Sequence, residues 1–346
     1  MAEQSLNELP HRSFSESLGA SFASSRCIRA PLDCNSFAVP IGLRGGTCRF
    51  PIFWHDPAWH IVDRERASEA ATQSLDAGVP TALLQIEMTD SINRADNKGT
   101  RILPYRADRF GVTPADFDAA SVIDLRMTHS AHSGTPPRYG SSQLHRWVKM
   151  PDRIDKACSL DAPSWPADVP EADLLVKKVE QLRRLSARQA AIWVTVCPTQ
   201  LGRLTKPLQQ AAPDVIVLEC RRTSALFAKK AIQCIASWAA LPQRPRLGVV
   251  ANIQDAADVV LLMTLGTDWV AIDSLVEASL SATVAVKREA TFPTSSFFAA
   301  SAAPPKPRYE IQSRLLRLVD DCWSTIAGLG VSNRSELDLS TVLMER

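Results

Sequence analysis

This sequence of 346 residues contains no run of about 18 apolar residues, the length that a helix needs to cross a lipid bilayer. Its N-terminus lacks the charged start and apolar run of a secretory signal, so we expect a cytoplasmic protein. Neither sign of charge dominates, because 39 Lys and Arg face 37 Asp and Glu, which leaves a formal net charge of +2. We therefore expect no binding to nucleic acid and none to an anionic membrane surface.

Patterns typical of metal and disulfide proteins are also missing. The eight cysteines are scattered and form no CxxC pair, which argues against a zinc site or a disulfide framework. His55, Asp56, His60 and Asp63 lie close together, but without the H-E-x-x-H spacing of a helical zinc site. We predict no metal site and eight reduced thiols.

The chain does contain a regular alternation of apolar strand patterns and helical patterns. A hydrophobic content of 45% is enough for a large core. The predicted strands are Arg49–Trp54, Thr81–Glu87, Ile102–Tyr105, Val122–Met127, Ala191–Val196, Asp214–Leu218, Leu247–Ala251 and Trp269–Ile272. The clearest predicted helices are Asp63–Ala77, Glu171–Leu185, Asp255–Leu265 and Arg308–Gly328. Strands that are apolar throughout are typical of a parallel sheet covered on both faces, so we predict an α/β fold, a (β/α)₈ TIM barrel.

The predicted barrel has an extension at each end. We assign residues 1–47 to an N-terminal extension that includes a mobile or surface-wrapping arm, residues 48–281 to the barrel, residues 282–307 to a Ser/Ala/Pro-rich linker, and residues 308–346 to a C-terminal helical segment. A long excursion, rich in Pro, Asp and Trp, covers residues 141–170. Its length favours a packed surface loop or a functional loop.

The most specific signal lies between Arg109 and Pro137. The segment opens with RFGVTP, in which Thr113 can cap a helix that Pro114 begins. It continues through the fourth predicted strand into a loop that holds three basic or titratable side chains and a glycine: Arg126, His129, His132 and Gly134. In parallel barrels catalytic groups gather at the carboxyl ends of the strands, so this loop is a candidate active-site loop.

This segment resembles the FMN-binding synthase domain of glutamate synthase, and the resemblance extends from about Pro51 to the C-terminus. The resemblance implies a TIM barrel, an FMN cofactor and the reductive amination of 2-oxoglutarate to L-glutamate. It also implies that Arg126, His129 and His132 hold or protonate the substrate, although the family has lysine or glutamine at these positions. Gly134 falls where the family's glycine-rich loop begins.

The residues that would hold the FMN phosphate depart from the family pattern. Such a site needs glycines, for close approach of backbone amides, and a positive helix end after strands seven and eight. The family's glycines after strands six and seven, a small residue after strand eight and a lysine in strand five are replaced by Arg221, Arg222, Ala251, Asn252, Asp273 and Val194. The two arginines can hold an anion, but a carboxylate repels phosphate. We therefore expect FMN at Arg221, Arg222, Asn252 and Gly134 to be weakly bound or lost.

The iron–sulfur cluster of the complete enzyme needs three thiolates soon after strand eight. The stretch from Ser279 to Phe292 contains no cysteine, so the sequence predicts no cluster.

Three hypotheses follow. The first is an FMN-dependent oxidoreductase of the glutamate synthase type. The second, which the site residues favour, is a non-catalytic barrel that serves as a partner subunit or binds a small anion. The third is another phosphate-binding barrel enzyme with a rebuilt site. The first hypothesis requires bound flavin, and the other two require none.

Overall fold

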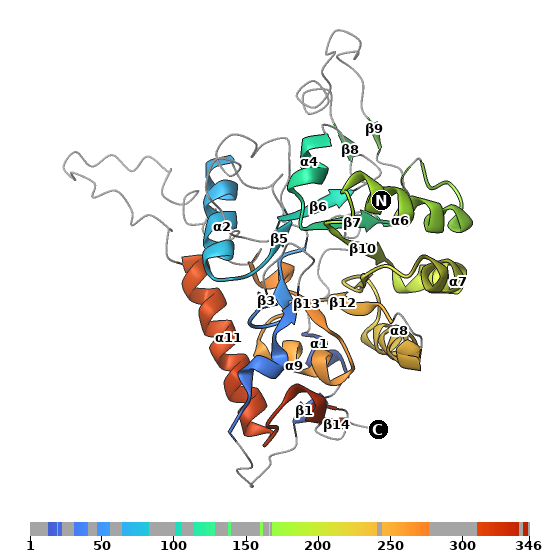
Figure 1. The fold of residues 1–346 in the computed structure, drawn as a ribbon. Coiled ribbons are helices and arrows are strands. Elements are labelled where there is room, and N and C mark those ends of the chain that lie inside the picture. Colours follow the sequence, from blue (N-terminus) through green and yellow to red (C-terminus); the bar gives the residue numbers. More distant parts are fainter. Residues whose placement is uncertain are drawn as a thin grey trace, which may run out of the picture.

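In this computed structural model the described residues are 13–18, 20–22, 31–40, 47–55, 64–82, 101–105, 114–128, 138–139, 160–161, 166, 168–240, 244–276, 310–338 and 342–344. Eight parallel strands form one sheet in the order β4-β13-β12-β11-β10-β7-β6-β5 (Figure 1). The strands are β4 (Ile52–Phe53), β5 (Thr81–Ala82), β6 (Arg101–Tyr105), β7 (Val122–Arg126), β10 (Ala191–Val196), β11 (Val215–Glu219), β12 (Arg246–Val250) and β13 (Trp269–Ala271).

The two edge strands of this sheet meet. A parallel bridge joins Trp54, directly after β4, to Thr81 of β5. The amide of Trp54 donates to the carbonyl oxygen of Pro80 at 2.8 Å, and the amide of Ala82 donates to that of Trp54 at 2.9 Å. The sheet therefore closes into a barrel in which neighbouring strands follow one another in the chain, as predicted.

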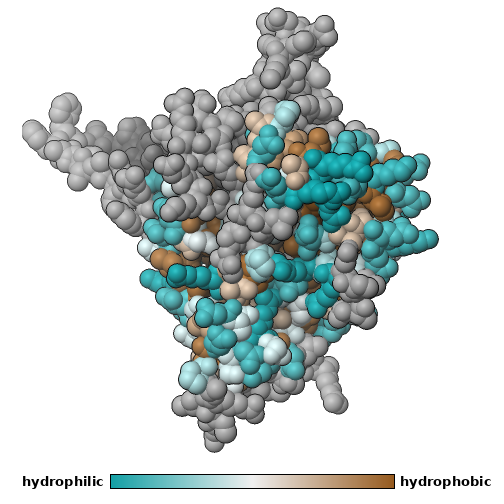
Figure 2. Space-filling view, in the orientation of Figure 1, coloured by the Kyte–Doolittle hydropathy of each residue, from teal (hydrophilic) through white to brown (hydrophobic). Residues whose placement is uncertain are grey.

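Helices between the strands form the outer layer. They are α2 (Arg64–Asp76), α4 (Pro114–Ala119), α6 (Leu175–Leu185), α7 (Leu201–Ala211), α8 (Ala225–Ala236) and α9 (Ala256–Thr264), followed by α11 (Glu310–Gly328). The predicted helix Glu171–Leu185 begins as a short 3-10 turn over Ala172–Leu174 before α6. The four predicted helices are present, each starting one to four residues later than predicted, and two of them end at the predicted residues, Leu185 and Gly328. Figure 2 shows mainly hydrophilic colours, with some hydrophobic patches, on the side of the molecule where α6 and α7 lie, as expected for amphipathic helices on a barrel.

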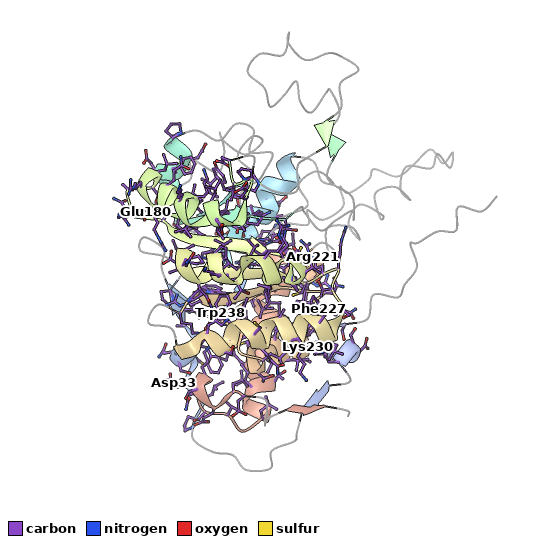
Figure 3. The ribbon with its side chains drawn as sticks, turned by 90° about the vertical axis from the view of Figure 1, so that its right-hand side faces the viewer. Asp33, Glu180, Arg221, Phe227, Lys230 and Trp238 are labelled. Carbon is purple, nitrogen blue, oxygen red and sulfur yellow. The ribbon has the colours of Figure 1, made fainter. Side chains whose placement is uncertain are left out.

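The turned view of Figure 3 shows α6, α7 and α8 lying side by side across one flank of the barrel. Glu180 marks α6 in this view, and Phe227 and Lys230 mark the outward side of α8. Each of these helices follows a barrel strand, so its first residues lie at the carboxyl end of the barrel.

Short elements near the two chain ends attach to the barrel. The helix α1 (Phe14–Leu18) packs against α8 and α9, and β1 (Ala20–Phe22) pairs antiparallel with β14 (Val342–Met344). The hairpin of β2 (Val39–Pro40) and β3 (Thr47–Cys48) places Val39 and Cys48 against the interior cluster at the amino end of the strands. The described part of the N-terminal extension is thus packed on the barrel surface.

Alternate strand residues face the barrel interior. The interior is apolar near the amino ends, where Phe53, Trp193 and Trp269 pack edge to face or tilted with ring centroids 5.2–6.2 Å apart. Val194 belongs instead to the cluster between the strands and the helices. The interior positions of β10 are held by Trp193 and Thr195, on either side of Val194 in the strand.

Several predictions fall on residues outside those described, among them the linker 282–307 and most of the excursion 141–170. The strand β8 (Arg138–Tyr139), just before the excursion, pairs with β9 (Leu160–Asp161), which lies within it. In the part of the chain that the structure describes, no helix is both long enough and apolar enough to cross a membrane.

Candidate functional site

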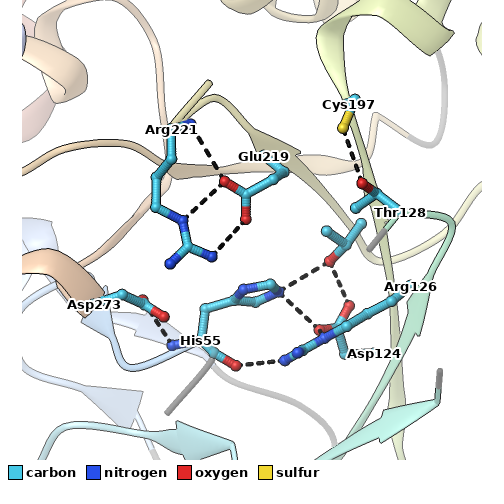
Figure 4. A network of polar contacts seen from close by, with 9 residues as sticks. His55, Asp124, Arg126, Thr128, Cys197, Glu219, Arg221 and Asp273 are labelled. Carbon is cyan, nitrogen blue, oxygen red and sulfur yellow. Dashed lines mark hydrogen bonds and ion pairs between the residues drawn. The ribbon is translucent and has the colours of Figure 1, made fainter. Parts of the chain in front are cut away.

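The carboxyl end of the barrel interior is filled with polar and charged side chains. They follow the apolar layer in the strands β4, β7, β10, β11 and β13, because each strand switches from apolar to polar residues at its interior positions near its end. The group comprises His55, Asp124, Arg126, Thr195, Glu219 and Asp273, all buried, with the half-buried Arg221 after β11 (Figure 4). This end of a parallel barrel is where active sites are built.

Asp124 is the centre of three polar contacts. One oxygen, Oδ1, accepts a hydrogen bond from the Thr195 hydroxyl at 2.6 Å. The other, Oδ2, lies 2.8 Å from Nε of Arg126 and 2.9 Å from Nε2 of His55. Burial alone would raise the pKa of Asp124, but Arg126 and His55 together hold it well below its ordinary value. Asp124 is therefore an ionised, fully paired carboxylate, not a proton donor.

His55 is fixed by contacts on both its ring and its backbone. Its Nε2 lies 3.1 Å from the Thr195 hydroxyl, and its backbone amide donates to Oδ2 of Asp273 at 3.1 Å. Its carbonyl oxygen accepts a hydrogen bond from Nη2 of Arg126. The other ring nitrogen, Nδ1, is buried and has no hydrogen-bond partner among the described residues. Because Asp124 accepts at Nε2, the neutral tautomer with its proton on Nε2 is favoured and leaves Nδ1 as a bare acceptor.

A second ion pair lies above the His55 ring in Figure 4. Arg221 donates to both oxygens of Glu219, from Nε at 3.0 Å and from Nη2 at 2.8 Å. This two-point geometry is the strongest that an arginine forms with a carboxylate. The neighbouring Arg222 is exposed, and partial burial together with Arg221 lowers its pKa.

The backbone amides at the start of α9, after β12, are bonded to protein oxygens. The amide of Ile253 donates to the Ser274 hydroxyl at 2.8 Å, and that of Gln254 donates to Oδ2 of Asp258 at 2.9 Å. The amide of Asp258 donates to Oδ1 of Asp255, the residue that caps the helix, at 3.1 Å. Two carboxylates thus occupy the positive end of α9.

The amide of Ser15, in the N-terminal extension, donates to Oδ1 of Asp258 at 2.7 Å. The extension therefore adds a further backbone contact at the start of α9.

The structure brings together part of the predicted site. Arg126 and Arg221 belong to the polar group, but each holds a carboxylate. Arg222 lies exposed next to Arg221, and Asn252 is half-buried at the end of β12. His129, His132 and Gly134 lie outside the described residues.

The sequence reasoning missed the centre of the site. Asp124 and Thr195 were treated only as members of apolar strands, and His55 was considered only as a metal ligand. Asp124 lies two residues before Arg126 in the same strand. Residues two apart in a strand point to the same face, so the position of Arg126 indicates that Asp124 also faces the barrel interior. In the described part of the chain, no three His, Cys, Asp or Glu side chains gather in a way that could hold a metal ion.

Comparison with known proteins gives one family match. Residues 84–223 match the conserved region in glutamate synthase. The matched segment, which is less than half of the 346-residue chain, is similar to the glutamate synthase family. The matched segment covers β6, β7, β10 and β11, which supply Asp124, Arg126, Thr195 and Glu219. The family resemblance predicted from Arg109–Pro137 is confirmed for this matched segment.

Solved structures with the same fold include flavocytochrome b2 and (S)-mandelate dehydrogenase. A flavocytochrome b2 double mutant with pyruvate bound is 11% identical, with 97% of this chain and 79% of that chain covered and a TM-score of 0.59. A mutant of an active chimera of (S)-mandelate dehydrogenase is 13% identical, with 97% and 92% covered and a TM-score of 0.59. A soluble mutant of the membrane-associated (S)-mandelate dehydrogenase from Pseudomonas putida is 13% identical, with 97% of this chain and 92% of that chain covered and a TM-score of 0.56. At these identities the likeness establishes the fold. No curated protein matches the chain.

Proposed function

We propose that this chain is a non-catalytic barrel that serves as a partner subunit and does not carry out FMN-dependent reductive amination of 2-oxoglutarate. The observation that carries the proposal is that the chain's own side chains accept hydrogen bonds from the backbone amides at the start of α9. The proposal includes no iron–sulfur cluster, since residues 279–292 contain no cysteine.

The start of α9 does not fit the phosphate group of FMN. A phosphate in a parallel barrel is held by backbone amides and helix starts in the loops after strands seven and eight. Here the amides of Ile253, Gln254 and Asp258 already donate to Ser274, Asp258 and Asp255. A phosphate would have to displace these acceptors and then lie beside two carboxylates, which repel a dianion.

The charges at the barrel mouth support the same conclusion. Among the described residues, two of the three buried carboxylates at the barrel mouth, Asp124 and Glu219, are closely paired with the guanidinium groups of Arg126 and Arg221, and the third is Asp273. Both arginines hold carboxylates of the same chain, so neither offers its full set of donors to a ligand. This arrangement also gives less support to a small-anion binder than to a partner subunit.

One observation favours a second candidate, a barrel enzyme with rebuilt acid–base chemistry. Nδ1 of His55 is buried without a partner among the described residues, while Nε2 is held by Asp124. A histidine oriented by a carboxylate on one nitrogen and bare on the other is the usual form of a general base. The test is exchange of the C3 protons of 2-oxoglutarate in deuterated water, followed by NMR. This candidate requires exchange that His55→Gln abolishes, and our main proposal predicts no exchange above the uncatalysed rate.

The proposed function is tested by incubating the purified chain with excess FMN, removing free ligand and recording the visible spectrum. We expect a colourless, folded protein and no 2-oxoglutarate- and ammonia-dependent turnover when reduced FMN is supplied. Flavin bands at about one equivalent per chain would overturn the proposal.

A further inference from the structure

The charge of this protein is distributed unevenly. Residues 175–240 contain eleven Lys and Arg and three Asp and Glu, a net charge of +8, while the whole chain carries +2. The remaining residues therefore carry −6. An excess of one sign in one part of a nearly neutral chain creates a local field that the net charge conceals.

The excess lies on one surface. Residues 175–240 include α6, α7 and α8, which lie side by side on the flank that faces the viewer in Figure 3. Exposed basic side chains on these helices are Lys177, Arg184, Arg203, Lys206 and Lys230, and two more, Arg188 and Arg222, lie in the segments after α6 and before α8. We call the outward side of these three helices the basic face. Of the three acidic residues, Glu219 is buried with Arg221, and Glu180 pairs with Arg184 and Arg188.

The basic face also carries most of the large apolar side chains that are exposed. Among the described residues, the large hydrophobic side chains left exposed are Leu185, Leu226, Phe227 and Leu316. Leu185 ends α6 and lies between Arg184 and Arg188 in sequence, whereas Leu226 (59% exposed) and Phe227 (42% exposed) begin α8. Helices of a barrel run opposite to its strands, so these apolar groups lie at opposite ends of the face.

We infer that the basic face is the docking surface for an acidic protein segment whose apolar side chains contact Leu226 and Phe227. This inference rests on the proposed role as a partner subunit and names the chemistry of the partner. The basic side chains of the face attract acidic residues of a partner, and the exposed aromatic and aliphatic groups bind its apolar residues, so a segment that carries both kinds of residue fits this face. A nucleic acid is less well matched, because aliphatic leucines offer nothing to phosphates and Glu180 lies within the face.

The test uses a fluorescent acidic peptide and the full chain. The peptide has about 18 residues, ~27 Å as a helix, with Glu on one face and Leu on the other. A second peptide keeps every Glu and replaces Leu by Ser, and a single-stranded oligonucleotide of equal charge is the third probe. We expect the Leu-containing peptide to bind about tenfold more tightly than either of the other two probes.

Variants locate the contact. Lys206→Glu combined with Lys230→Glu should weaken the peptide about tenfold, and so should Leu226→Ser combined with Phe227→Ser. The matched control, Leu316→Ser with Arg317→Glu, changes the same residue types on α11 and should bind like the wild type. Thermal melting of each variant verifies that it is folded.

The inference is overturned if the wild type binds no peptide, if the oligonucleotide or the Ser peptide binds as tightly, or if the α11 control loses as much affinity. These outcomes are distinguishable from failure of the proposed function. Retained FMN would remove the non-catalytic role whatever the peptide does, whereas absence of both flavin and peptide binding would remove only the docking surface.

Discussion

Replacing Asp124 by Asn tests whether the polar group at the barrel mouth is a buried ion pair. Asp124 is fully buried and holds Arg126, which is 3% exposed, at 2.8 Å. Asn can still accept from Thr195 through Oδ1, so the substitution removes mainly the charge. Breaking a buried pair on one side leaves the other charge without compensation, and we expect the free energy of unfolding to fall by about 3–5 kcal/mol.

Urea unfolding followed by circular dichroism measures this loss. The matched control is Glu180→Gln, which removes a carboxylate that bonds two exposed arginines, Arg184 and Arg188. Solvent screens that pair, and we expect no measurable change. A loss for Asp124→Asn below about 1 kcal/mol, no greater than that of a surface pair, would refute the buried ion pair.

Three further predictions concern stability. The pKa of Asp124 is depressed in the folded state, so ionised Asp124 stabilises the fold above its unfolded-state pKa of about 4, and this stabilisation is lost as the pH falls. The free energy of unfolding, measured at decreasing pH, should therefore fall in the wild type through this contribution, which Asp124→Asn lacks. Lys178→Met removes hydrogen bonds from Nζ to the Tyr105 hydroxyl at 2.7 Å and to Asp168 at 2.6 Å. Urea unfolding should show that the free energy of unfolding falls by about 1–3 kcal/mol, and an unchanged value would count against a structural role for Lys178. Gly248→Val adds a side chain whose Cβ would lie 3.2 Å from a methyl group of Val217, and thermal melting should show a destabilisation of about 1–3 kcal/mol. An unchanged melting temperature would mean that the barrel interior has spare room.

The barrel itself could be predicted from the sequence because its strands are short, apolar and regularly spaced. The strand Ala191–Val196 was predicted with the boundaries that the structure has. The hairpin β2-β3 and the pairing of β1 with β14 could not be predicted, because each strand has only two or three residues and no periodicity of its own. Such pairs depend on tertiary contacts, as when Val39 packs against the interior cluster.

The site was less predictable than the fold. Arg126 was identified because it ends a strand, but its partner His55 is 71 residues away in sequence and meets it only when the barrel closes. Asp124 lies within a strand whose residues are all buried, and the sequence alone does not tell which of its two faces points into the barrel interior. Asp273 was expected to repel a phosphate, and the structure gives it the His55 amide as a partner. Loss of flavin binding stays a prediction.

We propose that the chain's own hydrogen-bond acceptors take the place of an FMN phosphate at the start of α9. The decisive measurement is a fluorescence titration of the purified chain with FMN and with riboflavin, which lacks only the phosphate. We predict equally weak quenching curves for the two flavins, because Ser274, Asp255 and Asp258 already hold the amides. Binding of FMN about a hundredfold or more tighter than riboflavin, ~2.7 kcal/mol from the phosphate, would contradict it.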